Sequence, residues 1–212
     1  MGKIKIAIVD DVEMTRIGLM YLLNKNNEYE LVSEASNGRI FITQLGIIKP
    51  DIVLMDVNMP IMNGIEATKE ALKALPELKI LALTNDDAEA YIEDMITAGA
   101  KGFLMKKVDA AELSKAIQIV INGGTYLSPE LISYYNKSSI SQSSKYKINL
   151  TSQEEKVLHF LCQGLSIKEI HNKTNFQIPE IEHIFNTLSV KTNTRNAVGL
   201  VLFAIKNKLV VI

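Results

Sequence analysis

The sequence has no tryptophan and a single cysteine, and it lacks a long apolar run. The one cysteine, Cys162, excludes an internal disulfide, and its apolar neighbours Phe160 and Leu161 indicate a buried thiol rather than a nucleophile. Even the longest uncharged apolar run, Gly199–Ile205, is far shorter than the roughly 20 residues of a membrane-spanning helix. Residues 1–11 enter a strand pattern directly, without the pattern of a signal peptide. We therefore expect a soluble, cytoplasmic protein without a membrane partner.

The chain also lacks a strong excess of either charge, with a formal net charge of -1 at pH 7. Residues 1–124 carry 13 Lys and Arg against 18 Asp and Glu, residues 125–147 carry 3 against 1, and residues 148–212 carry 7 against 5. Domains that bind nucleic acid usually have a strongly positive face, because contacts with phosphate groups supply much of their affinity. The C-terminal part is only weakly basic, which disfavours tight binding to nucleic acid.

Residues 3–122 alternate short β-branched runs with amphipathic helical patterns, which is typical of βα units around a parallel sheet with helices on both faces. We predict five strands and five helices. The predicted strands are Lys3–Asp10, Tyr29–Ala35, Asp51–Asp56, Lys79–Asn85 and Ala100–Lys106. The predicted helices are Val12–Asn26, Gly38–Ile48, Gly64–Leu75, Asp86–Gly99 and Asp109–Gly123. Glycines 123 and 124 then end the last helix.

The remainder of the chain is helical. "TSQE" (Thr151–Glu154) and "SIKE" (Ser166–Glu169) both fit the capping box, in which a hydroxyl and a Glu satisfy the free amides at a helix start. Gly164 ends the first of these helices, so a helix-turn-helix is expected. Two more helices, from about 178 and about 195, complete a small four-helix domain. The predicted domains are 1–124 and 148–212, joined by a linker at 125–147 whose Ser-rich second half is flexible.

Polar side chains stand where four of the predicted strands end. Asp10 and Asp11 follow the first strand, Asp56 ends the third, Thr84 the fourth and Lys106 the fifth. In an open parallel sheet these ends meet at one edge, where ligands bind. Three crowded carboxylates are tolerated when a hard cation such as Mg²⁺ lies among them. A lysine and a hydroxyl beside them suit a transferred phosphoryl group, whose oxygens need positive charge and hydrogen-bond donors.

These residues resemble the receiver domain of two-component response regulators, which has a flavodoxin-like fold. The motifs "VDD" (9–11), "DIVLMDVNMPIMNG" (51–64), "LT" (83–84) and "GFLMK" (102–106) stand in the order and spacing of that family, and the resemblance spans nearly all of 3–122. It implies that Asp56 accepts a phosphoryl group from a sensor histidine kinase.

The resemblance also implies the ligands of a Mg²⁺ ion. Asp11 and Asp56 would bind the ion directly, together with the backbone carbonyl of Asn58, and Asp10 would act mainly through water. An Asp-dependent phosphohydrolase is the alternative enzyme, but its familiar D-x-D arrangement would need a second acid where Asn58 stands. We therefore expect no enzyme activity beyond slow autodephosphorylation.

A phosphorylation switch follows from the same resemblance. Thr84 and Lys106 would hold the phosphoryl oxygens. The charge added to Asp56 would draw Thr84 inward, and the vacated space would admit the aromatic ring of Phe103. Lys107 stands where many relatives have a cis proline, and the sequence leaves the isomer of the Lys106–Lys107 bond open.

"NLTSQEEKVLHFLCQGLSIKEI" (149–170) closely resembles the start of the LuxR-type helix-turn-helix domain. With the receiver domain, it makes the whole chain similar to the NarL/FixJ class of response regulators. This resemblance implies transcriptional regulation through DNA binding, with a homodimer on activation. In that class the last helix, here with the apolar stripe Ala197–Ile205, forms a dimer contact, although such a stripe can equally be core.

The segment that aligns with the DNA-reading helix, Gln177–Val190, contains no Lys or Arg. The two cations of the family pattern fall on Pro179 and Glu182. The helix itself should form, because proline is accepted in the first turn and the glutamates at 180 and 182 favour its positive end. Its contact with DNA should weaken.

Two functions therefore remain open for the C-terminal domain. One is a transcription regulator that binds DNA. The other is a phosphorylation-controlled module for protein interaction or dimerisation that binds DNA weakly or not at all. The candidate DNA contacts are Lys168, Gln177, His183, Asn186, Thr187, Lys191 and Arg195.

Overall fold

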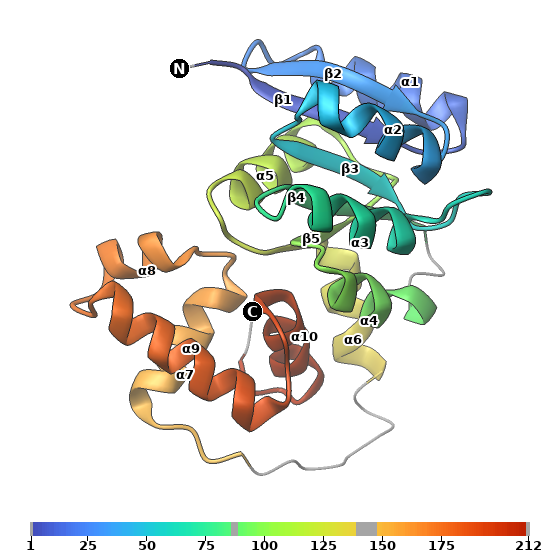
Figure 1. The fold of residues 1–212 in the computed structure, drawn as a ribbon. Helices are drawn as coiled ribbons and strands as arrows, with labels where there is room; N and C mark the ends of the chain where they lie inside the picture. The colour runs from blue at the N-terminus through green and yellow to red at the C-terminus, as the bar shows by residue number, and fades with distance from the viewer. Residues whose placement is uncertain (1, 86–88, 139–147, 211–212) are drawn as a thin grey trace. The chain divides into compact units, whose positions relative to one another are not determined.

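The computed structural model describes residues 2–85, 89–138 and 148–210 (Figure 1). The chain divides into two compact units, Met1–Ile121 and Asn122–Ile212, which we call the N-terminal and C-terminal units. The N-terminal unit has the predicted parallel sheet with helices on both faces, and the C-terminal unit has the predicted helical domain. The fold class is therefore confirmed.

The strands form one sheet in the order β2-β1-β3-β4-β5-β6. They are β1 (Ile4–Val9), β2 (Tyr29–Ala35), β3 (Ile52–Asp56), β4 (Lys79–Thr84), β5 (Gly102–Met105) and β6 (Tyr126–Leu127). The pairs from β2 to β5 are all parallel. Every residue of β3 is buried, as expected for a parallel strand covered on both faces. The prediction of five strands was wrong by one, because β6 lies in the segment predicted to be a linker.

Five helices flank the strands of the N-terminal unit. They are α1 (Glu13–Leu23), α2 (Gly38–Ile48), α3 (Gly64–Ala74), α4 (Glu89–Ala98) and α5 (Ala110–Ile121). Helix α3 contacts both α2 and α4 on one face of the sheet, whereas α1 contacts α5 on the other (Figure 1). Asn37 and Asn63 cap α2 and α3 by accepting backbone N–H bonds. No such side-chain cap begins α1, which follows Val12.

Helix α3 begins directly against the end of β3. A Cβ atom added to Gly64 would overlap the carbonyl oxygen of Asp56, and the N–H of Gly64 donates to the carbonyl oxygen of Val57 at 2.9 Å. Only glycine allows this close approach. The backbone that carries Asp56 is therefore held against the first turn of α3.

The C-terminal unit contains α6 (Pro129–Ser138), α7 (Ser152–Cys162), α8 (Ile167–Lys173), α9 (Ile178–Thr192) and α10 (Ala197–Lys206). Both predicted capping boxes are present, with Thr151 before α7 and Ser166 before α8. Helix α6 lies in the predicted linker and contacts α10. The rest of the predicted flexible segment, 139–147, lies outside the described residues.

Helix α10 supplies much of the apolar core of the C-terminal unit. Six of its residues, from Val198 to Ile205, are buried, so the stripe is core within this chain. Cys162 is also buried, and burial raises the pKa of its thiol to about 12, which fits the predicted core role. Across the described residues, the structure contains no helix with the length and apolar character needed to span a membrane.

Candidate functional site

Three of the predicted site residues meet at the carboxyl edge of the sheet. The Nζ atom of Lys106 lies 2.8 Å from Oδ2 of Asp10 and 2.9 Å from Oδ2 of Asp56. Strands β1, β3, β4 and β5 are hydrogen-bonded in parallel, which brings these residues to one edge. Asp10 is fully buried and Asp56 is 4% exposed. One lysine therefore bridges two buried carboxylates.

Asp11 completes an acidic pocket, by which we mean Asp10, Asp11, Asp56 and Lys106. One carboxylate oxygen from each aspartate lies within 4.8 Å of the other two, and Asp11 is the exposed member. Oδ2 of Asp10 accepts no well-aligned hydrogen bond from the described residues, although Lys106 forms an ion pair with it. Three carboxylates whose oxygens converge in this way are a donor set that fits Mg²⁺, which prefers oxygen ligands.

Burial and charge act in opposite directions on the groups of the pocket. Burial raises the pKa of Asp56 from 3.8 to about 6, although the hydrogen bond and positive charge of Lys106 oppose the shift. Burial alone would lower the pKa of Lys106, but Asp10 and Asp56 outweigh it, so this pKa lies above 10.5. The N–H of Asn58 donates to Oδ1 of Asp56 at 3.4 Å. The ionised form of Asp56 is therefore less stable in the pocket than in water, even with Lys106 beside it.

Thr84 stands at the end of β4 beside this pocket. It is 5% exposed, and its carbonyl oxygen accepts the N–H of Lys106 at 2.8 Å. Its hydroxyl donates to the carbonyl oxygen of Asn85 at 3.2 Å. The backbone thus couples Thr84 to Lys106, whereas the predicted contact of the hydroxyl with a phosphoryl group stays a prediction.

The predicted switch residue Phe103 lies within β5, and its ring is fully buried. We predicted an inward movement of this ring on phosphorylation, and the ring is already inside in this structure. The Lys106–Lys107 peptide bond, which the sequence left open, is trans.

Sequence reasoning missed Arg16, a residue of α1. One guanidinium nitrogen of Arg16 donates to the carbonyl oxygen of Asp10 at 2.9 Å, and Nε pairs with Glu34 at 3.3 Å. The acceptor at Asp10 is a backbone atom, which leaves no mark on the residue types. The sequence therefore gave no signal for this contact.

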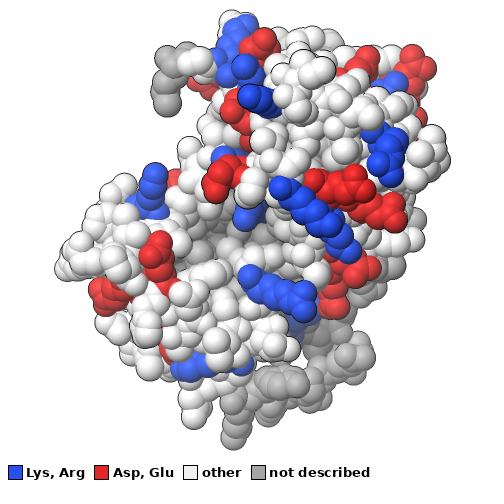
Figure 2. Space-filling model, in the orientation of Figure 1, with Lys and Arg blue, Asp and Glu red and all other residues white. Residues whose placement is uncertain are grey.

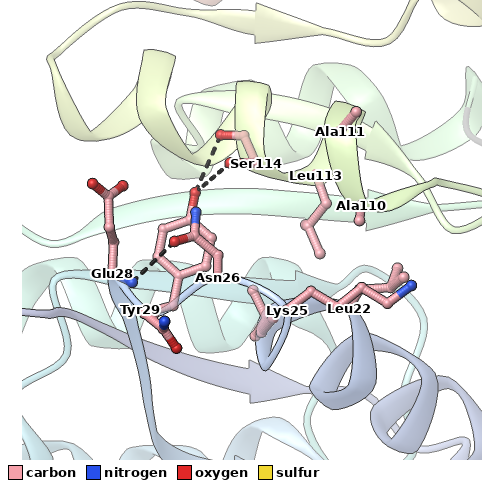
Figure 3. Close-up of a pocket in the computed structure, with 11 residues that line it drawn as sticks. Leu22, Lys25, Asn26, Glu28, Tyr29, Ala110, Ala111, Leu113 and Ser114 are labelled. Carbon is pink, nitrogen blue, oxygen red and sulfur yellow. Dashed lines mark hydrogen bonds between the residues drawn. The ribbon is translucent and has the colours of Figure 1, made fainter.

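A cavity of about 480 Å³ lies elsewhere in the N-terminal unit, between residues 22–29 and 110–114. The hydroxyl of Tyr29 lies 2.7 Å from Oγ of Ser114 there, and Figure 3 shows these two side chains pointing toward each other. None of the residues of the acidic pocket lines this cavity, so the two are separate.

The C-terminal unit engages one of the predicted DNA contacts internally. Nζ of Lys191, on α9, lies 2.7 Å from Oε2 of Glu154 and 3.1 Å from the carbonyl oxygen of Asn149. Glu154 is 5% exposed and also accepts the N–H of Thr151 in the capping box of α7. Lys191 therefore ties α9 to the start of α7, and its charge is largely neutralised.

The other candidate DNA contacts are spread over α8, α9 and the residues between α9 and α10. Lys168, Gln177, His183, Asn186 and Arg195 are exposed, whereas Thr187 is half-buried. The exposed positions along α9 are Pro179, Glu182, His183, Asn186, Val190 and Lys191. On the face drawn in Figure 2, Lys and Arg side chains over α7 to α10 stand singly among uncharged and acidic surface. The described part of α9 therefore presents no cluster of positive charge.

Comparisons with known proteins agree with this geometry. The model of the response regulator receiver domain matches residues 6–118. The transcriptional regulatory protein LnrK of Bacillus subtilis is 34% identical over 95% of this chain and 98% of its own, and the transcriptional regulatory protein DegU of Brevibacillus brevis is 30% identical over 97% and 94%. The crystal structure of ChrA, a response regulator of a heme-sensing two-component system, matches with a TM-score of 0.55 and 28% identity over 99% of this chain and 100% of its own.

The sheet, the acidic pocket and these matches define a receiver domain followed by a helical output domain. The chain belongs to the response regulators of two-component systems and is of the NarL/FixJ type, whose output domain binds DNA.

Proposed function

We propose that Asp56 is the phosphoryl acceptor of this response regulator and that a sensor histidine kinase is the donor. A carboxylate oxygen of Asp56 attacks phosphorus, the bond from phosphorus to the histidine nitrogen breaks, and the imidazole leaves with the electron pair of that bond. The observation that carries this proposal is the ion pair of Lys106 with both Asp10 and Asp56, beside Asp11.

Each residue of the acidic pocket has its own role in this proposal. Asp11, Asp56 and the carbonyl of Asn58 would hold Mg²⁺, with Asp10 acting through water; when bound, the ion neutralises charge on the phosphoryl oxygens. Lys106 already faces Asp56, so its ammonium can bind a phosphoryl oxygen there without a large movement. After transfer, the ammonium of Lys106 also stabilises the negative charge of the phosphoryl group on Asp56.

The switch rests on Thr84 and Phe103. The phosphoryl group adds negative charge at Asp56, and the Thr84 hydroxyl can exchange the carbonyl of Asn85 for a phosphoryl oxygen. Since the carbonyl of Thr84 also accepts the N–H of Lys106, movement of Thr84 shifts the end of β5. The packing around the buried ring of Phe103 then changes.

The proposed output is transcriptional regulation by a cytoplasmic protein that forms a homodimer on activation. The predicted contacts with DNA are Lys168, Gln177, His183, Asn186, Thr187 and Arg195. Two findings support this proposal. One is the helix-turn-helix pair α8 and α9, and the other is the similarity to two transcriptional regulatory proteins.

A second function is favoured by one observation. The exposed face of α9 carries Glu182 and no free cation, since Lys191 is paired with Glu154. A protein that docks on this face would meet no excess of positive charge. A phosphorylation-controlled protein-interaction module is therefore the alternative output.

Labelling with a small phosphodonor tests the acceptor. Acetyl phosphate and Mg²⁺ should add one phosphoryl group to the wild type and none to Asp56→Asn, as measured by intact mass. Asp94→Asn, which removes an exposed acid on α4, is the control and should be labelled like the wild type. Equal labelling of Asp56→Asn would refute the proposed acceptor.

Binding of DNA duplexes tests the output. The phosphorylated protein should bind duplex DNA at low salt, and the affinity should fall as salt rises. No binding to any duplex, in either phosphorylation state, would leave the protein-interaction module as the output.

A further inference from the structure

Arg16 is a mostly buried cation that contacts the backbone of the acidic pocket. It lies in the second turn of α1, and its side chain is 15% exposed. Its guanidinium donates to the carbonyl oxygen of Asp10 and to the carboxylate of Glu34, which stands near the end of β2. The group therefore joins three elements, β1, β2 and α1, at the edge of the sheet where the pocket lies.

Each polar atom of Asp10 has its own partner. Its N–H donates to the carbonyl of Ala35 at 3.1 Å, Oδ1 accepts the N–H of Val12 at 2.9 Å, and Oδ2 pairs with Lys106. The carbonyl oxygen is the atom that Arg16 holds. That oxygen belongs to the peptide group that joins Asp10 to Asp11, so Arg16 fixes the plane from which the side chain of Asp11 projects.

This fixation matters because nothing else described in the structure holds Asp11 firmly. Asp11 is exposed, and α1 begins after it without a side-chain cap. A guanidinium is planar and presents its donors in a rigid fork, so one arginine can set the direction of a carbonyl and be oriented by a second carboxylate. Glu34 supplies that second contact.

We propose that Arg16 is a positioning residue for the metal-binding carboxylates: it holds the Asp10–Asp11 peptide so that the Asp11 carboxylate points into the pocket and can bind Mg²⁺. The proposal rests on the proposed function, because it assumes that the pocket takes this ion. Glu34 orients Arg16 and has a smaller effect of the same sign.

Affinity for Mg²⁺ in the absence of any phosphodonor is the direct readout. Metal-free wild type, Arg16→Gln, Arg16→Lys and Glu34→Gln are titrated with MgCl₂ and followed by amide NMR signals. Loss of an orienting contact typically weakens metal binding about 10-fold or more, which is the expected rise in Kd for Arg16→Gln. Arg16→Lys should recover part of the affinity, and Glu34→Gln should weaken it by about 2-fold to 5-fold.

Arg39 offers a matched control. It is an exposed arginine of α2 that pairs with Glu70 at 3.7 Å, away from the carbonyl of Asp10. Arg39→Gln removes the same charge from the same unit, so it separates a general effect of charge from positioning. Its Mg²⁺ affinity should equal that of the wild type.

Labelling by acetyl phosphate at varied Mg²⁺ gives a second readout. For Arg16→Gln, the Mg²⁺ concentration at half-maximal rate should rise about as much as Kd, whereas the rate at saturating Mg²⁺ should stay within about 2-fold of the wild type. This split is what a positioning role predicts, because excess ion restores occupancy of the pocket.

Two results would overturn the proposal. One is an Arg16→Gln protein, folded by circular dichroism, whose Kd for Mg²⁺ lies within about 2-fold of the wild type. The other is a lowered melting temperature with labelling that saturating Mg²⁺ does not restore, which would make Arg16 structural only. If Arg16→Gln fails to fold, Arg16→Lys and Glu34→Gln decide by the same criteria. Failure of the wild type to bind Mg²⁺ or accept phosphate would instead refute the proposed function.

Discussion

The two units of this chain differ in how their charged side chains are arranged. In the N-terminal unit, three carboxylates and one lysine converge on the edge of the sheet, and Lys106 contacts Asp10 and Asp56 at once. In the C-terminal unit, the one lysine of α9, Lys191, forms an ion pair with Glu154 of the same unit. These charges of the N-terminal unit are therefore gathered in one pocket, whereas the cation of α9 links two helices of the C-terminal unit.

Within the C-terminal unit, some residues are required for the fold and others are not. The capping boxes at Thr151 and Ser166 are intact, so α7 and α8 form as the sequence dictates. The exposed face of α9 contributes nothing to the core and is free to change. A helix-turn-helix can therefore persist while its charge toward DNA is reduced.

Removal of the bridging lysine should have the largest effect on stability. In Lys106→Met, the buried carboxylates of Asp10 and Asp56 face each other without a cation, so we expect a loss of about 4 kcal/mol in the free energy of unfolding. Urea denaturation at pH 7 with EDTA measures it. Lys101→Met, which removes an exposed lysine just before β5, should change little. Equal stability of the two variants would contradict a bridging role.

The dependence of stability on pH sharpens the contrast within the receiver. Asp56 has a pKa raised from 3.8 to about 6, so the folded protein favours its protonated form. The stabilisation that this form gives to the folded state is complete below pH 3.8 and is lost as the pH rises through 6. The stability of metal-free wild type relative to Asp56→Asn should therefore fall by about 3 kcal/mol between pH 3 and pH 7.

Urea denaturation of both proteins at several pH values checks this difference. The comparison cancels the titration of the groups that do not interact with Asp56. A difference that stays constant from pH 3 to pH 7 would mean that Asp56 has an ordinary pKa in the folded protein.

The contact of α3 with the acceptor strand should have the next largest effect. In Gly64→Ala the new methyl group meets the carbonyl of Asp56, so we expect a loss of about 2 kcal/mol and slower labelling. Gly46→Ala is the matched control, because a Cβ there meets nothing within 4 Å and alanine favours the helix. Thermal denaturation of both variants decides, and equal melting temperatures would contradict the close approach.

The smallest expected effect concerns the output. Pro179→Lys combined with Glu182→Lys restores two cations to the exposed face of α9 and should raise duplex affinity about 10-fold at low salt, with a steeper salt dependence. Glu30→Lys with Thr43→Lys adds the same charge to exposed positions of the N-terminal unit and serves as control. Fluorescence anisotropy measures both. Equal gains would show that α9 does not face DNA.

The parts of the fold that the sequence predicted are those encoded locally. Apolar runs that end in Asp56 or Lys106 define both a strand and the edge where its polar residue lies, so the acidic pocket could be predicted from the residues at the strand ends and from the resemblance to the receiver domain. Helix starts at Thr151 and Ser166 were equally local, because a capping box spans four residues.

The missed parts depend on contacts between distant residues. Lys191 and Glu154 are 37 positions apart, and no local pattern marks one as the partner of the other. Helix α6 lies mostly in the first half of the predicted linker 125–147, where Leu131 and Tyr135 stand four residues apart and are both buried. Packing of such a short helix against α10 decides whether it forms.

Chemical mapping of the acceptor tests the central claim most directly. An acyl phosphate formed with acetyl phosphate and Mg²⁺ can be reduced with borohydride, which converts the modified aspartate to homoserine, and peptide mass spectrometry then locates it. The account predicts homoserine at residue 56 and aspartate at residues 10 and 11. Homoserine at either of those positions, or its absence from residue 56, would contradict the account.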